Sequence, residues 1–356
     1  MPPDWSEMRI ASAASAFPKY YYPQAVLLEA FKTYWNGRID NPRFLEKLHA
    51  NVGVDGRYTS LPLEAYLEME TWGQANDHWI DVAQDVGQRA LEQALKLAGL
   101  KPTDLDALFM VSVTGIASPS IDARLINRMG LSPSIRRVPV FGLGCVAGAS
   151  GISMASDYVR AYPDRVAALL AVELCSLTLQ KDDLSVANLI SAGLFGDGAG
   201  AVIIAGSDRG LPGPEIVATQ STFYPDTEEV MGWAISEKGF RIVLSPGVPD
   251  VVREHLAEDA DTFLSKNGLS RNDIESWVVH TGGPKVLEAT QDALGLPAEA
   301  LSASWDCLRR TGNLSSASVL LVLEEFMMRR RPAAGTYGIL AAMGPGFCSE
   351  LILLRW

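Results

Sequence analysis

The chain alternates short apolar runs with longer stretches in which apolar residues recur at helical spacing. Residues 107–113, 165–174 and 277–280 are mostly apolar runs of strand length. Helical spacing is clearest over residues 79–97, and Gly99 marks the end of that helix. Strands that alternate with helices in this way predict a mainly parallel sheet with helices on both faces.

The same pattern predicts the remaining elements. Further strands are expected at residues 9–17, 138–141, 215–221, 240–244, 337–343 and 347–355. Further helices are expected at residues 24–36, 43–51, 119–129, 184–193, 249–266, 284–294 and 315–329. Residues 195–204 are typical of a glycine-rich turn followed by a buried strand, whereas residues 53–77 show no clear pattern.

A cluster of glycine and proline between Gly206 and Pro214 interrupts the pattern. Strands alternate with helices on both sides of it. The pattern therefore predicts two similar α/β halves, an N-terminal one over residues 1–210 and a C-terminal one over residues 211–356.

Composition narrows the class of protein. The chain has 356 residues, of which 48% are hydrophobic and 20% charged, as expected for a folded domain with a large core. The 42 acidic residues outnumber the 30 basic ones, which argues against a surface that binds nucleic acid. No apolar run is long enough to span a membrane, and the first residues do not resemble a signal peptide. Four scattered cysteines and four scattered histidines form no metal-binding pattern, so we expect a cytoplasmic protein without a bound metal.

Cys145 is the first candidate for chemistry. It follows a predicted strand and a glycine-rich turn, and a run of helix-forming residues comes directly after it. At a helix N-terminus the unpaired N–H groups and the helix dipole favour a thiolate, which is a nucleophile. The alternative is a structural cysteine packed under the turn, since free cysteines are often buried.

His280 and Asn313 are the second and third candidates. His280 ends a predicted strand before a glycine-rich turn, where open α/β sheets place ligands. Asn313 precedes a predicted helix, so an N-cap is its simplest role. Together with a cysteine, they are compatible with a papain-like peptidase or with acyl transfer that forms a carbon–carbon bond. The peptidase signature around the cysteine is absent, which favours acyl transfer.

Several motifs in order carry a specific resemblance. They are Gly144-Cys145, Leu194 to Ala199, His280-Thr281-Gly282-Gly283-Pro284, Gly312 to Ala317 and Gly344-Pro345-Gly346. The series resembles type III polyketide synthases, the chalcone and stilbene synthase superfamily, in particular bacterial alkylpyrone and alkylresorcinol synthases. The resemblance implies a thiolase-like fold of two similar halves, each with a mixed sheet and flanking helices in αβαβα layers. It also implies a homodimer that acts on acyl-CoA and malonyl-CoA and has no bound cofactor.

The resemblance assigns a role to each candidate. Cys145 matches the nucleophile that takes the starter acyl group from CoA. His280 and Asn313 match the pair that stabilises the enolate formed when malonyl-CoA loses CO2, and His280 would also hold Cys145 as a thiolate. Phe195 matches a gatekeeper between the CoA tunnel and the cavity in which the product grows.

Other positions are expected to contact substrate. The second gatekeeper falls at Ile242, or at Phe240 if the alignment shifts, and a hydroxyl partner for Glu173 falls at Val113, with Thr114 next to it. Thr178, Trp233, Ser315 and Glu173 are further cavity candidates, and Lys285, Lys47 and Arg57 are candidates for CoA phosphates.

The aliphatic gatekeeper and the bacterial-style motifs lead to a hypothesis about the product. We expect a fatty acyl-CoA starter and an alkylpyrone or alkylresorcinol product. The nearest rival is a β-ketoacyl-acyl-carrier-protein synthase III, which shares the Cys–His–Asn set. A non-catalytic thiolase-like protein is the remaining alternative.

Overall fold

The computed structural model describes residues 7–39 and 41–356. Across them, nine strands form one mixed sheet in the order β11-β12-β13-β8-β1-β7-β6-β4-β5. The strands of this sheet are β1 (Arg9–Ala16), β4 (Ala107–Val111), β5 (Arg136–Val140), β6 (Val166–Leu174), β7 (Asp197–Ala205), β8 (Glu215–Phe223), β11 (Ile274–Val279), β12 (Tyr337–Gly344) and β13 (Cys348–Arg355). Arg9 of β1 pairs with Glu215 of β8, and this short contact joins two half-sheets.

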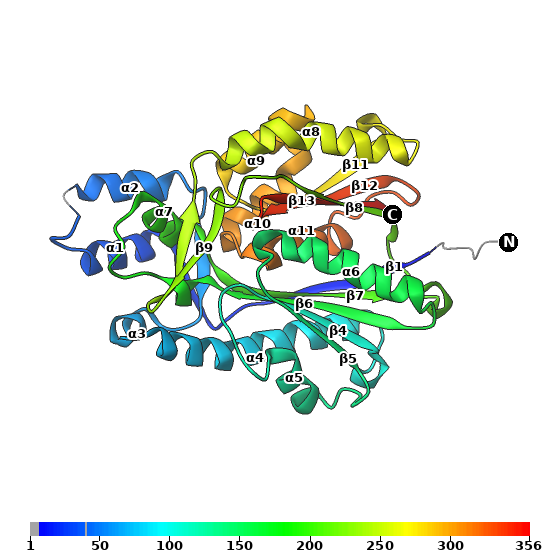
Figure 1. The fold of residues 1–356 in the computed structure, drawn as a ribbon, viewed down its shortest axis with the longest axis horizontal. Helices are drawn as coiled ribbons and strands as arrows, with labels where there is room; N and C mark the ends of the chain where they lie inside the picture. Colours follow the sequence, from blue (N-terminus) through cyan, green and yellow to red (C-terminus); the bar gives the residue numbers. More distant parts are fainter. Residues whose placement is uncertain (1–6, 40) are drawn as a thin grey trace.

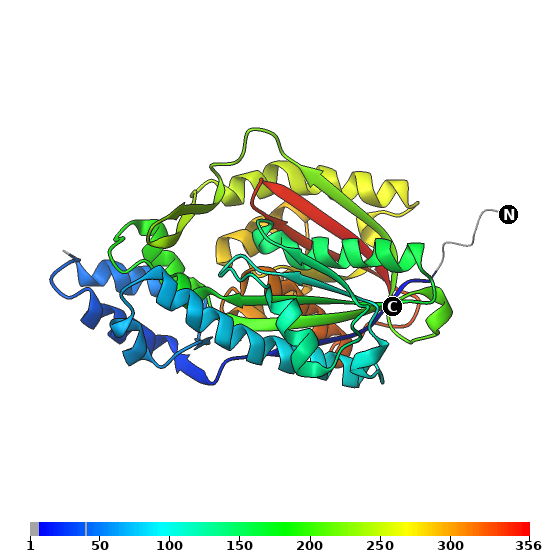
Figure 2. The ribbon, with the colours of Figure 1, turned by 60° about the horizontal axis from the view of Figure 1, so that its bottom comes forward.

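Helices form three layers around the two half-sheets (Figure 1). The helices are α1 (Gln24–Tyr34), α2 (Pro42–Ala50), α3 (Leu63–Glu68), α4 (Trp72–Leu97), α5 (Ile121–Met129), α6 (Ala147–Ala161), α7 (Val186–Leu194), α8 (Val248–Lys266), α9 (Pro284–Leu294), α10 (Ser302–Thr311) and α11 (Ser318–Met328). Helices α4 and α5 cover the outer face of one half-sheet, and α8, α9 and α10 cover that of the other. Figure 2 shows α4, in cyan, lying along the strands of the N-terminal half.

Helices α6 and α11 form the central layer between the half-sheets. Their side chains share one buried cluster with residues from both half-sheets, including Ile152 of α6, Val322 of α11, Val202 of β7 and Ile352 of β13. A helix buried on all sides must be apolar all round, and α11 fits, because seven of its eleven residues are buried. The layer order is therefore αβαβα, as the resemblance implied.

The two halves repeat one strand order. In the N-terminal half β1, β7, β6 and β4 lie side by side, with two antiparallel pairs followed by a parallel one. In the C-terminal half β8, β13, β12 and β11 follow the same sequence of pairings. Helices α6 and α11 precede equivalent strands, β6 and β12. The prediction of a mainly parallel sheet is thus wrong, because each half places a central antiparallel strand between its neighbours.

Residues 195–204 also differ from the prediction. Strand β7 already begins at Asp197, so Gly198 and Gly200 lie within the strand instead of in a turn. A Cβ added at Gly198 would lie 2.5 Å from Leu314, and one at Gly200 would lie 2.9 Å from Leu320. These glycines let α11 and the turn before it approach the strand closely.

Parts of the chain without a clear pattern form helices and strands too. Helix α4 begins at Trp72, earlier than predicted, because Thr71 and Gln74 form a capping box there. Helix α10 was not predicted, and residues 53–77 also contain β3 (Gly56–Thr59), which pairs with β2 (Tyr20–Pro23). Among the described residues no helix is both long enough and apolar enough to cross a membrane.

Elements outside the two half-sheets gather at one end of the molecule. Helices α1, α2 and α7 lie there, together with the hairpin of β9 (Met231–Ser236) and β10 (Gly239–Leu244) (Figure 1). They lie beyond the N-terminal end of α6, and they wall the cavities described below.

Gly148 tests how closely the central helices must pack. A Cβ at Gly148 of α6 would lie 2.2 Å from the backbone oxygen of Ser316, which cannot rotate away. We expect Gly148→Ala to destabilise the protein by roughly 2–3 kcal/mol in urea unfolding. Gly87 of α4 is the matched control, because its added Cβ would make only ordinary contacts of 3.4 Å or more. Gly87→Ala should change stability by less than about 1 kcal/mol, and an equal loss in both variants would contradict the close-packing argument.

Candidate active site

Cys145 lies where the chain enters the central helix α6. Residues Gly144–Val146 form a 3-10 turn that runs into the helix. Gly144 has a φ of 57° and packs against Pro345, so a side chain there would be strained and would clash. The thiol is buried, with 6% of the residue exposed, and it donates a hydrogen bond to Ser315 Oγ at 3.6 Å. The prediction that Cys145 sits at a helix N-terminus is confirmed.

Asn313 lies at the equivalent entry to α11. Its Oδ1 accepts a hydrogen bond from the backbone N–H of Ser315 at 2.8 Å and from Ser318 Oγ at 3.4 Å. Its Nδ2 donates to the carbonyl of Gly282 at 3.3 Å, in the turn that follows His280. Asn313 is therefore not the predicted N-cap, since Leu314 caps the 3-10 turn before α11 and Ala317 caps α11 itself. Its amide oxygen bonds to donors of that turn, and its amide nitrogen points to the turn after His280.

His280 directly follows β11 and is 5% exposed. Its backbone N–H donates to the Ala341 carbonyl at 2.9 Å, which fixes the residue at the end of the parallel pair β11–β12. Within residues 7–39 and 41–356, neither ring nitrogen has a hydrogen-bond partner. A buried imidazole without partners is unusual and is available to a substrate.

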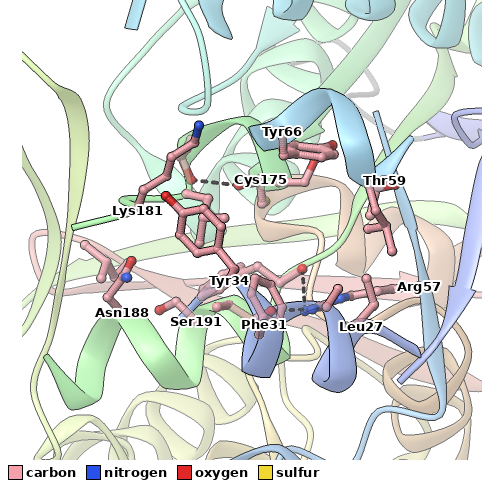
Figure 3. A pocket seen from close by; sticks show the side chains of 18 of the residues that line it. Leu27, Phe31, Tyr34, Arg57, Thr59, Tyr66, Cys175, Lys181, Asn188 and Ser191 are labelled. Atoms are coloured by element: carbon pink, nitrogen blue, oxygen red, sulfur yellow. Dashed lines mark hydrogen bonds between the residues drawn. The ribbon is translucent and has the colours of Figure 1, made fainter. Parts of the chain in front are cut away.

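One cavity, called here the catalytic cavity, brings these three residues together. Cys145, His280 and Asn313 all line it. A second cavity, the inner cavity, is lined by side chains of α1, α3, α7 and the β9–β10 hairpin (Figure 3). Phe195 lines both cavities, and so stands between them as a gatekeeper would.

Burial shifts the pKa of Cys145 and that of His280 toward the neutral form of each group, when each is considered alone. It raises the pKa of the Cys145 thiol to about 12, although the hydrogen bond to Ser315 acts the other way. It lowers the pKa of His280 to about 4. An isolated thiolate or an isolated imidazolium is thus disfavoured. Transfer of the thiol proton to His280 creates both charges together in one cavity, where they attract each other.

Glu173 does not lie in the cavity wall as predicted. It is fully buried, and its two oxygens accept hydrogen bonds from Ser316 Oγ and from Thr114 Oγ1, the latter at 2.9 Å. The hydroxyl partner is therefore Thr114, whereas Val113 contributes only its backbone N–H, at 3.2 Å. Burial raises the pKa of Glu173 to about 7, with all four hydrogen bonds opposing it. Ser316 follows Ser315, so the carboxyl group is linked to the turn beside Cys145.

Three predicted cavity residues line the inner cavity, namely Thr178, Trp233 and Ile242. Ile242 pairs with Trp233 across the β9–β10 hairpin. Phe240 is 1% exposed and packs behind them, with its ring centroid 5.9 Å from that of Trp233. Ile242 therefore lines the inner cavity, as expected for the second gatekeeper position, whereas Phe240 does not.

The three basic candidates for CoA differ in their surroundings. Lys285 is exposed, lies in the first turn of α9 and lines the catalytic cavity. Lys47 is exposed on α2, whose Leu48 lines the same cavity. Arg57 is 3% exposed, and its guanidinium donates to the carbonyls of Phe195, at 2.9 Å, and Ala192. The predicted CoA contact of Arg57 is therefore wrong, because both ends of its guanidinium hold the gatekeeper segment.

Sequence reasoning missed a polar network at the inner cavity. Asp197 accepts hydrogen bonds from Ser60 Oγ at 2.5 Å and from the backbone N–H of Ser176 at 2.8 Å. Tyr66 OH lies 2.5 Å from Ser176 Oγ. The hydroxyl of Ser176 also donates to Asp197. Ser60 and Tyr66 come from residues 53–77, where no pattern marked them.

The fold and the site by themselves define a class of protein. Two thiolase-like halves are combined with a buried cysteine and asparagine at the entries to the equivalent helices α6 and α11, and with a buried histidine at the end of β11. This is the arrangement of an acyl-transferring condensing enzyme. Family models for the chalcone and stilbene synthases match residues 15–209 with the N-terminal domain and residues 215–356 with the C-terminal domain. The chain belongs to the chalcone and stilbene synthase family, and it is a CoA-dependent type III polyketide synthase.

Individual relatives agree with this assignment. The chain is 49% identical to a 1,3,6,8-tetrahydroxynaphthalene synthase of Streptomyces peucetius subsp. caesius, over 98% of this chain and 93% of that protein. It is 34% identical to the alpha-pyrone synthesis polyketide synthase-like Pks18 of Mycobacterium tuberculosis, over 78% and 70% of the two chains. The crystal structure of tetrahydroxynaphthalene synthase from Streptomyces coelicolor A3(2) superposes with a TM-score of 0.93 at 31% identity, covering 98% and 99%. Membership of this family excludes the two alternatives considered from the sequence, a β-ketoacyl-acyl-carrier-protein synthase III and a non-catalytic thiolase-like protein.

The pairing of Cys145 with His280 can be tested by alkylation. If His280 takes the thiol proton, iodoacetamide should label Cys145 at a rate that levels off near neutral pH. In His280→Ala the thiol keeps a pKa raised to about 12 by burial, so its thiolate forms only as the pH rises. We expect at least a tenfold slower reaction at pH 7, with a rate that still climbs above pH 9. Cys145→Ser corrects for the other cysteines, and identical pH profiles in both proteins would contradict the pairing.

Proposed function

We propose that the protein condenses malonyl-CoA units repeatedly and releases an aromatic polyketide of the tetrahydroxynaphthalene class. The observation that carries the proposal is the single cavity lined by Cys145, His280 and Asn313, which meets a separate inner cavity at Phe195. The identity of 49% over nearly the whole chain to a tetrahydroxynaphthalene synthase supports this product class.

Loading requires a nucleophile and a place for its proton. In the proposed step His280 takes the proton of Cys145, the thiolate attacks the carbonyl carbon of the starter thioester, and CoA leaves as its thiolate. The leaving thiolate then takes a proton from the imidazolium, which returns His280 to the neutral form that burial favours. The acyl group stays on Cys145 as a thioester.

Extension requires stabilisation of a negative oxygen. Loss of CO2 from malonyl-CoA leaves an enolate whose oxygen needs hydrogen-bond donors. A neutral imidazole supplies one N–H, and Asn313 supplies an amide whose second N–H is not used in the bond to Gly282. The enolate carbon attacks the Cys145 thioester, the thiolate leaves, and the chain on CoA is two carbons longer.

A fatty acyl starter that leads to an alkylpyrone or alkylresorcinol is the second candidate. The inner cavity favours it, since many of its lining side chains are aliphatic or aromatic, among them Leu27, Phe31, Leu63, Trp233 and Ile242. Similarity to the alpha-pyrone synthase-like protein adds support. Both candidates use the same catalytic residues, so the starter decides between them.

Two further expectations accompany the proposal. Lys285 and Lys47 are the side chains expected to hold CoA phosphates, because both are exposed beside the catalytic cavity. A homodimer is expected as well, and the 48% exposed Phe141, in the turn before Cys145, is an apolar side chain that such an interface can cover.

Asn313→Ala separates loading from decarboxylation. We expect release of CO2 from malonyl-CoA to fall by about 10²-fold, since one donor to the enolate is lost. Loading of a starter onto Cys145 should persist, and mass spectrometry of the intact protein measures it. Cys145→Ala should show the opposite pattern, with no loading and some remaining decarboxylation. If Asn313→Ala decarboxylates at the normal rate, its role in enolate stabilisation is wrong.

Product analysis decides the starter. The protein is incubated with malonyl-CoA alone and with acyl-CoAs of graded length, and the products are separated and identified by mass spectrometry. We expect a naphthalene-class product from malonyl-CoA alone. Alkylpyrones or alkylresorcinols formed in preference, from the longer starters, would replace this proposal with the second candidate.

A further inference from the structure

The inner cavity is lined mainly by apolar side chains, but it also has hydroxyl groups. One of these has no hydrogen-bond partner within the part of the chain that the structure describes, and others bond to neighbouring groups of the protein. Ser191 of α7 lines it. Among the described residues the Ser191 hydroxyl has no hydrogen-bond partner, although its oxygen is buried. Its backbone carbonyl is occupied, because it accepts the N–H of Phe195 at 3.0 Å. A buried hydroxyl without a partner costs stability, and no bond holds its rotamer in place.

A second polar point lies on α3 and the segment after β6. Tyr66 and Ser176 both line the inner cavity, and their hydroxyl oxygens are 2.5 Å apart. Ser176 Oγ donates to Asp197 Oδ2 at 2.5 Å, so Ser176 is left to accept a hydrogen bond from Tyr66. Tyr66 OH also accepts the backbone N–H of Leu61 at 3.1 Å. Burial raises the pKa of Tyr66 well above its usual value, so the phenol stays a proton donor.

These two points face each other across the cavity. In Figure 3, Tyr66 and Cys175 lie on one side and Ser191 lies on the opposite side, near Phe31. They come from different parts of the chain, since Tyr66 is on α3 and Ser191 is on α7. A ligand that fills the space between them could meet both.

The two candidate ligands of the inner cavity, a poly-β-ketoacyl chain and a fatty acyl chain, differ in the number of oxygens that they carry. A poly-β-ketoacyl chain carries an oxygen on every second carbon, whereas a saturated fatty acyl chain has none beyond its thioester. Hydroxyl groups at separated points in an apolar cavity match the first pattern, because each can bond one carbonyl or enol oxygen.

We propose that Ser191 and the Tyr66–Ser176 pair hold oxygens of the growing poly-β-ketoacyl chain, and so act as positioning residues that set its fold before cyclisation. The proposal rests on the proposed function, because only a polyketide offers such oxygens. In it, Ser191 turns its free hydroxyl to one oxygen, and Tyr66 redirects its proton from Ser176 to another. Neither residue takes part in loading or decarboxylation.

The test compares Ser191→Ala and Tyr66→Phe with the unaltered protein, with malonyl-CoA as the only substrate. The measured quantity is the ratio of the main cyclised product to shorter or misfolded lactones. Loss of one hydrogen bond should lower this ratio by about twofold to tenfold in each variant. Release of CoA per enzyme should stay within about twofold, since the catalytic cavity is unchanged. An unchanged ratio in both variants overturns the proposal.

Ser60→Ala is the matched control for packing. Ser60 is 4% exposed and donates to the same carboxylate, Asp197, but it does not line the inner cavity. It should leave the product ratio unchanged even if the melting temperature falls. An equal shift of the ratio in Ser60→Ala and Tyr66→Phe would show that the network only supports the wall, and would overturn the role of Tyr66.

Ser191→Ala keeps the test decisive if Tyr66→Phe folds poorly, because removal of the unpartnered hydroxyl leaves no group unpaired. Failure of the proposed function would give a different result. In that case the unaltered protein makes no oxygenated polyketide from malonyl-CoA, whatever the variants do.

Discussion

The close contact between the entries to the two central helices determines the rest of the structure. A side chain at Gly148 of α6 would overlap the backbone of Ser316, and one at Gly144 would overlap Pro345. Because these glycines allow the approach, Cys145 and Ser315, which are 170 residues apart in sequence, come within hydrogen-bond distance. The candidate catalytic site forms because both halves bury their central helices against each other in the shared core.

This burial decides the electrostatics of the site. Cys145 and His280 are both enclosed, and each is pushed toward its neutral form. Neutral histidine is a suitable donor to a developing enolate, and a charge pair can form when the thiol proton moves to it. Glu173 lies behind this site. Its carboxyl group is tolerated in the core because four hydrogen-bond donors surround it. The same low-polarity surroundings that disfavour isolated charges strengthen the interactions of a bound thioester.

Phe195 lies between two cavities with different linings. The exposed Lys285 and the three candidate catalytic residues lie on one side, whereas Trp233, Ile242 and Thr178 lie on the other. Arg57, which was expected to bind CoA, instead fixes the backbone around Phe195 from within the protein. Cys145 and Asn313 thus lie at the entries to the central helices, and His280 lies at the end of β11. The inner cavity is walled largely by elements outside the two half-sheets, which can vary without disturbing that central layer.

The sequence alone determined the alternation of strands and helices, the two halves and the three residues that meet in one cavity, because periodicity, glycine turns and ordered motifs are local signals. It did not determine the antiparallel strand in each half, the strand β7 in place of a turn, or the hydroxyl partner of Glu173. Pairing direction, the packing of Gly198 against Leu314 and the position of Thr114 are set by residues distant in sequence. Only the tertiary structure shows that Arg57 is internal, since burial depends on what the rest of the chain places around it.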